Sequence, residues 1–140
     1  MQSYENLGAA ISATQPTWLL AYLTVLVAAN LGAVFFVAQK QPQGWRPRWE
    51  AIAIVVSFLL AGELMEYMYQ QLGYVRLLGL AHIVCWGPVY AWIFIRREEL
   101  VKAAYFGKFV MFYLVMAGIS LTVDVIDVAR YLLGETGSMI

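Results

Sequence analysis

Long, nearly uninterrupted runs of apolar residues dominate the chain, and polar residues gather in the short segments between them. Four runs reach transmembrane length: Pro16–Ala38, Trp49–Gln70, Tyr74–Ile95 and Tyr105–Leu133. An α-helix needs about 20 apolar residues to cross a hydrocarbon core of roughly 30 Å. The pattern therefore predicts an all-α integral membrane four-helix bundle, with residues 1–140 forming one domain.

The segments between the runs differ in character. Gln39–Arg48 contains two prolines and a glycine and is predicted to be a loop. The second connection is short enough to require a tight turn, with Gly73 as the residue of positive φ. The charged segment Arg96–Ala104 is compatible with a helical extension beyond the membrane. Two alternatives are open for the residues before Pro16, a short amphipathic helix at the interface or a frayed end.

The composition agrees with a membrane protein. Hydrophobic residues make up 62% of the chain and charged residues 13%, against roughly 45–50% and about 25% in soluble domains. The net charge is zero and no basic tract stands apart from the apolar runs, so nucleic acid is not expected as a partner. The expected partner is the lipid bilayer.

Basic residues predict how the chain is oriented. Seven of the nine Lys and Arg residues lie in the first and third connections or within a few residues of them. These are Lys40, Arg46, Arg48, Arg96, Arg97, Lys102 and Lys108. Because cytoplasmic loops are enriched in Lys and Arg, both termini are expected on the non-cytoplasmic side (N-out/C-out). In a bacterium the protein would lie in the inner membrane.

Ionisable residues inside the spans fall into one layer. They are Glu63 and Glu66 in the second span, His82 in the third, and Asp124 and Asp127 in the fourth. At about 1.5 Å of rise per residue, all five lie in the outer half of the bundle. Charged groups within a span usually face the bundle interior, so we expect these side chains to meet there as an ion-binding or proton-binding layer.

Five further side chains are expected to support this layer: Arg76, Arg130, Tyr67, Tyr131 and Ser120. Asp127 lies three residues before Arg130 on the same helix face, which predicts an ion pair between them. The four carboxylates of the layer carry up to −4, whereas Arg76 and Arg130 return only +2. The sequence therefore predicts that a carboxyl group keeps its proton, that a cation is bound, or that water reaches the layer.

No cofactor is predicted, although a bound cation remains open. Glu63, Glu66, His82, Asp124 and Asp127 are the candidate ligands if a metal ion is present. A di-iron bundle with two Glu-x-x-His motifs is excluded within one chain, because the chain has a single histidine.

Three functions are compatible with this layer. The preferred hypothesis is a cation or proton pathway, built as an oligomer because four short helices enclose little volume. The second is an accessory subunit of a larger membrane complex, in which the charges form ion pairs that hold the helices in register. The third is a membrane enzyme that uses a metal ion or an acid–base pair in the outer half.

Overall fold

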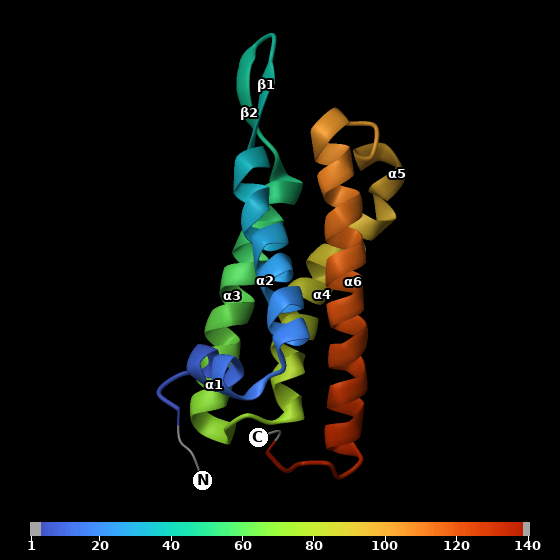
Figure 1. Cartoon of the computed structure of the whole chain (residues 1–140). Coiled ribbons are helices and arrows are strands. Elements are labelled where there is room, and N and C mark those ends of the chain that lie inside the picture. Colours follow the sequence, from blue (N-terminus) through green and yellow to red (C-terminus); the bar gives the residue numbers. More distant parts are fainter. Residues whose placement is uncertain (1–3, 139–140) are drawn as a thin grey trace.

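The computed structural model describes residues 4–138 and is mostly helical (Figure 1). Four helical segments are long and apolar enough to cross a membrane, with bounds Thr17–Phe36, Trp49–Leu72, Arg76–Ile95 and Ala104–Leu132. Each begins and ends within a few residues of the predicted span. The fold is therefore consistent with an integral membrane protein.

The first two spans are α2 with its extension and α3. Helix α2 (Thr17–Gly32) continues into the short 3₁₀-helix η1 (Ala33–Phe36), and α3 covers Trp49–Leu72. Gly73 ends α3 with φ of +75°, which confirms the predicted turn glycine.

The third and fourth spans are α4 with its preceding turn and α6. The 3₁₀-helix η2 (Arg76–Leu78) leads into α4 (Gly79–Ile95), and α6 covers Ala104–Leu132. Helix α4 packs against both α3 and α6, and α2 makes fewer contacts with the other helices. Tyr22 on α2 donates a hydrogen bond of 2.8 Å to the carbonyl of Met116 on α6, so α2 is tied across the bundle.

The first and the last residues that the structure describes lie at one end of the bundle, together with α1 (Figure 1). We call this the terminal end, and the opposite end, which carries the strands, the hairpin end. Helix α1 (Leu7–Thr14) buries Leu7 and Ala10. The residues before Pro16 that the structure describes are thus helical from Leu7 and not frayed there.

The first connection was expected to be a loop, but it forms a two-stranded antiparallel hairpin. Strands β1 (Ala38–Gln41) and β2 (Gly44–Pro47) pair directly. A residue before proline is biased toward extended backbone, and both Gln41 and Arg46 precede a proline. Gly44 supplies the positive φ of +115° near the turn. The prolines and the glycine that indicated irregular structure therefore shape a hairpin.

The charged third connection does not simply extend a helix. Helix α4 ends at Ile95, and a separate short helix α5 (Arg97–Leu100) follows. Leu100 of α5 is buried in the hydrophobic cluster that fills the hairpin end of the bundle, where it packs with Phe106 of α6. Burial of this leucine explains why the segment folds back instead of continuing the helix axis.

Candidate functional site

His82 and Asp124 form a hydrogen-bonded pair inside the bundle. Nδ1 of His82 on α4 lies 2.8 Å from Oδ2 of Asp124 on α6. The His82 ring also stacks on the indole of Trp86, with 4.4 Å between centroids and 17° between planes. Trp86 is only 1% exposed, so the imidazole is held by a buried aromatic face and a carboxylate.

Gly79 allows this pair to form. A Cβ at position 79 would lie 2.9 Å from Oδ1 of Asp124 and 3.1 Å from its Cα. Only the absence of a side chain lets α4 and α6 come this close. Gly79 lies three residues before His82 on the same helix, so the close approach sets the distance between the two functional groups.

Two cavities meet at His82. The larger has a volume of about 530 Å³ and lies among α1, α2, α3 and α4. The smaller has a volume of about 390 Å³, and its lining includes both His82 and Asp124. Ser120, a predicted supporting residue, lines the smaller cavity and is buried. His82 therefore lines both cavities, in the terminal half of the bundle.

A second group of charges lies nearer the terminal end and is joined by ion pairs. Nη1 of Arg76 lies 2.9 Å from Oδ1 of Asp127, and its Nε lies 3.3 Å from Oε2 of Glu135. Nη2 of Arg130 lies 2.6 Å from the same Glu135 oxygen. The prediction of an Arg130–Asp127 ion pair is thus wrong. Asp127 pairs with Arg76 instead, and the turn after α6 brings Glu135 close to Arg130.

Glu135 was missed by the sequence reasoning because it lies beyond the end of the fourth span. Its place only five residues after Arg130 was the available signal. The hydrogen bond from Arg130 holds the pKa of Glu135 below its usual value. At the same end, burial, with a smaller effect from Asp127, raises the pKa of the Tyr74 phenol.

Glu66 holds α1 in place and does not meet His82. Its Oε2 accepts a hydrogen bond of 3.0 Å from the backbone N–H of Leu7, and its Oε1 accepts one of 2.7 Å from Gln70. The N–H groups of the first helical turn have no partner within the helix, and the N-terminus of a helix favours a negative charge. The carboxylate therefore anchors α1 to α3.

Glu63 and Tyr67 lie on an outer face of α3. Both side chains are exposed, Tyr67 to 65%. The expectation that Glu63 and Tyr67 meet the other layer residues in the interior is wrong, because on α3 only Glu66 of this group is partly buried, against Leu7 of α1. Tyr131 on α6 is half-buried.

The expected surplus of interior negative charge is not gathered in one place. Asp127 is paired with Arg76, Asp124 faces His82, Glu66 accepts two hydrogen bonds, and Glu63 is exposed. Within residues 4–138, no three His, Cys, Asp or Glu side chains lie close enough together to share a metal ion. The five candidate ligands therefore do not form a common metal site.

The polar layer does not continue through the hairpin half of the bundle. A mostly apolar cluster that includes Ile54 and Ile93 fills this region. Buried polar side chains there include Asn30, Ser57 and Tyr113, none of which is a carboxylate or a base. Glu50 and Arg96 form an ion pair that ties the start of α3 to the end of α4. This pair lies at the hairpin end and is separated from His82 by most of the length of α4.

The chain matches no protein-family model, no curated protein and no solved structure.

Proposed function

We propose that this chain forms part of a proton pathway in a membrane, with His82 and Asp124 as the proton-binding pair. The hydrogen bond between them, inside the bundle and beside two cavities, is the observation that carries the proposal. Histidine is the side chain that changes charge most readily near neutral pH, and a neighbouring carboxylate stabilises the imidazolium. A proton is favoured over a metal ion because the carboxylates are dispersed among separate partners.

One chain supplies only part of such a path. Apolar side chains fill most of the hairpin half of the bundle. Its buried polar side chains Asn30, Ser57 and Tyr113 are too few to form a continuous relay to the hairpin end. Transfer across the whole membrane then requires a second copy of the chain or a larger membrane complex that provides the remaining groups.

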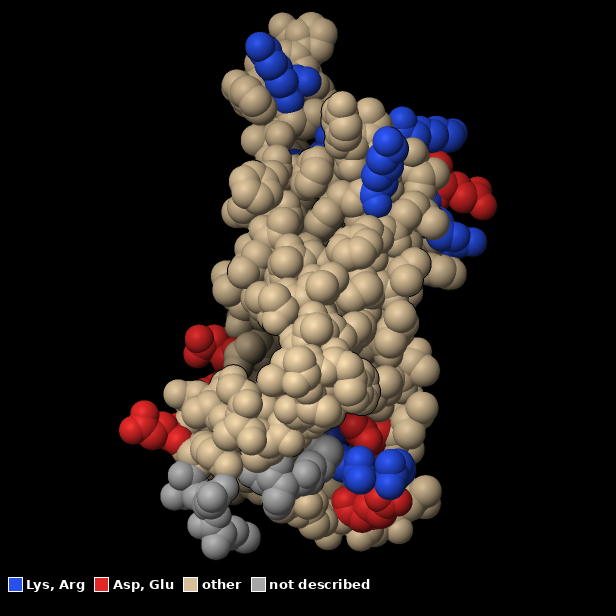
Figure 2. Space-filling model, viewed as in Figure 1, with Lys and Arg blue, Asp and Glu red and all other residues tan. Residues whose placement is uncertain are grey.

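The distribution of charge supports an outward-facing site. Basic side chains gather at the hairpin end, whereas acidic side chains predominate at the terminal end (Figure 2). By the positive-inside tendency, the hairpin end faces the cytoplasm and both termini face outward. His82 then lies in the outer half of the bundle and exchanges protons with the outer surface.

The test uses the fact that His82 is the only histidine in the chain. Nitrogen NMR of protein labelled at histidine and held in lipid nanodiscs therefore reports on this ring alone. If His82 binds and releases protons, its signals should change between the neutral and the protonated form when the pH is varied across the physiological range. A ring that stays in one form over this range contradicts the proposal.

Proton movement is measured separately in sealed liposomes that contain a pH-sensitive dye. His82→Gln and Asp124→Asn should slow acid-driven proton uptake, because each removes one member of the pair. Glu63→Gln is the matched control, since it alters an exposed carboxylate outside the pair. Equal uptake by all of these proteins and the unaltered chain argues against a pathway.

The second candidate function is an accessory subunit, and the Arg76–Asp127–Glu135–Arg130 network favours it. These ion pairs join η2 to α6 and to the turn after α6, which is how charged groups hold helices in register. A protein that is inert in the proton assay but copurifies in a defined stoichiometry with a larger membrane complex supports this alternative.

A further inference from the structure

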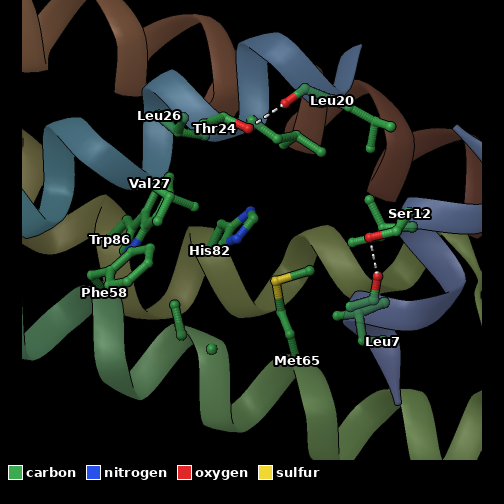
Figure 3. Close-up of a pocket in the computed structure, with 15 residues that line it drawn as sticks. Leu7, Ser12, Leu20, Thr24, Leu26, Val27, Phe58, Met65, His82 and Trp86 are labelled. Carbon is green, nitrogen blue, oxygen red and sulfur yellow. Dashed lines mark hydrogen bonds between the residues drawn. The ribbon is translucent and has the colours of Figure 1, made fainter. Parts of the chain in front are cut away.

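The larger cavity is lined mostly by apolar side chains, together with the imidazole of His82 and the hydroxyl groups of Ser12 and Thr24 (Figure 3). Its volume of about 530 Å³ lies within the range of small-molecule sites, roughly 300–1,000 Å³. Leu26, Phe58 and Met65 are typical of the lining. Among the residues that the structure describes, His82 is the only titratable one in the lining, which includes no lysine, arginine or carboxylate.

Within the part of the chain that the structure describes, two ring nitrogens of this cavity have no hydrogen-bond partner, Nε1 of Trp86 and Nε2 of His82, and that of Trp86 is fully buried. Nε2 of His82 is therefore the one that a ligand can reach. The hydroxyl of Ser12 donates to the carbonyl of Gly8, and that of Thr24 donates to the carbonyl of Leu20, each at 2.8 Å (Figure 3). Nδ1 of His82 is engaged by Asp124. Among residues 4–138, no side chain or backbone group is hydrogen-bonded to Nε2.

The partner on Nδ1 decides what Nε2 can do. An ionised Asp124 can only accept, so the hydrogen between it and His82 belongs to Nδ1. In the neutral ring, Nε2 is then left with a lone pair and acts as an acceptor. A ligand recognised here must therefore donate a hydrogen bond, as a hydroxyl group does.

The cavity opens on the side of the bundle between α2 and α3. Thr24 and Val27 on α2 and Gly62 on α3 line it and are exposed. Figure 2 shows a hollow at this place, above α1. In a bilayer this opening faces the acyl chains, so a molecule reaches the cavity from within the lipid.

We propose that this cavity binds a neutral, lipid-soluble alcohol, phenol or quinol whose hydroxyl group donates to Nε2 of His82. The inference rests on the proposed function, because the hydroxyl group would bind the ring nitrogen that the Asp124 hydrogen bond leaves unengaged. The apolar part of the ligand lies between α2 and α3 against Leu26, Phe58 and Met65. An anionic head group is disfavoured, because the lining supplies no cation beyond a histidine that already faces Asp124.

Binding is tested in nanodiscs with three probes of equal chain length: n-decanol, n-decane and decanoate. At a pH where the ring is neutral, n-decanol should shift the Nε2 signal of labelled His82 to a saturable limit. Decane, which has no donor, should leave the signal in place. Decanoate should require a higher concentration than the alcohol. An equal shift with decane, tighter binding of decanoate, or no saturable shift with the alcohol overturns the inference.

Two helical glycines provide a matched pair of variants. A Cβ at Gly62 or at Gly87 would meet no other atom within 4 Å, so both positions accept a side chain. Gly62 lines the large cavity, whereas Gly87 lines a different one on the opposite side of α4. Gly62→Leu should weaken n-decanol binding about tenfold by filling the opening, and Gly87→Leu should leave it unchanged. Equal affinities in the two variants contradict the assigned cavity.

The two proposals fail in different ways. If the His82 signals respond to pH but n-decanol leaves Nε2 unchanged, the ligand site is rejected and the proton site stands. If the alcohol shifts Nε2 but the ring does not respond to pH, the proton site is rejected and the ligand site stands.

Discussion

Single residues decide whether α4 and α6 can bring their polar groups together. Gly79 lets the two helices approach until the His82 ring reaches Asp124. The hydrogen bond then defines which ring nitrogen faces the cavity. A residue with no side chain is thus as important for this site as the two residues with ionisable side chains.

The first prediction concerns this close approach. Gly79→Ala should lower the free energy of unfolding by about 1–3 kcal/mol, because the new methyl group meets the backbone and side chain of Asp124. It should also perturb the nitrogen signals of His82. Gly87→Ala is the control, since the space at that position is open. Thermal melts in detergent compare the stability of the two variants. Equal melting temperatures contradict the packing described for Gly79.

The second prediction concerns Glu135. Because the hydrogen bond from Arg130 lowers the pKa of this carboxyl, the ion pair contributes to stability above the unfolded-state pKa. That contribution is lost as the pH falls through the lowered pKa of the folded state. Carbon NMR should show Glu135 titrating below the range of an ordinary glutamate, and Arg130→Gln should move the midpoint upward. An unchanged midpoint in the variant argues against the pairing.

At the scale of elements, α1 is the segment whose position depends most on one contact. It is an eight-residue helix joined to α3 through Glu66, which accepts the N–H of Leu7. A helix of this length is not stable alone in water. Its place over the larger cavity therefore depends on packing of Leu7 and Ala10 and on the carboxylate of Glu66.

The third prediction tests this anchor. Glu66→Ala should speed amide hydrogen exchange across Leu7–Thr14 about fivefold, which corresponds to about 1 kcal/mol for a carboxylate at a helix N-terminus. Exchange in the middle of α3 should not change. Glu63→Ala removes an exposed glutamate from the same helix and serves as the control. Identical exchange of α1 in both variants contradicts the role of Glu66.

At the scale of the whole molecule, the two ends of the bundle differ in charge and in polarity. The hairpin end carries most of the basic residues and a mostly apolar core, whereas the terminal end carries the ion pairs of Arg76 and Arg130 and the two cavities that meet at His82. This asymmetry predicts one orientation in the membrane and places the His82 site toward the outside.

The fourth prediction tests this orientation in intact cells. In a Cys85→Ser background, which lacks cysteine, Thr136→Cys should react with an impermeant thiol reagent added outside. Gln43→Cys, exposed between the two strands of the hairpin, should react only after the membrane is opened. The reverse labelling pattern contradicts the orientation and the outward-facing site.

Much of the architecture could be predicted from local patterns. The span bounds follow from the length of apolar runs, and the Gly73 turn follows from the short second connection. The hairpin was missed because the same prolines and glycine that indicate a loop also favour extended strands around a turn. Short helix α5 was missed because burial of Leu100, which is not visible along the chain, decides its direction.

Sequence alone determined the number and length of the spans and the asymmetry of basic residues, because bilayer thickness and charge placement act on consecutive residues. Only the tertiary structure decided which polar side chains contact one another inside the bundle. A helix that is apolar on all sides carries little information about its rotation, so Glu63 was expected inside and lies outside. The close packing at Gly79 brings Asp124 to His82, and the turn after α6 brings Glu135 to Arg130. Neither contact could be predicted from the sequence, because each depends on how the chain packs in three dimensions.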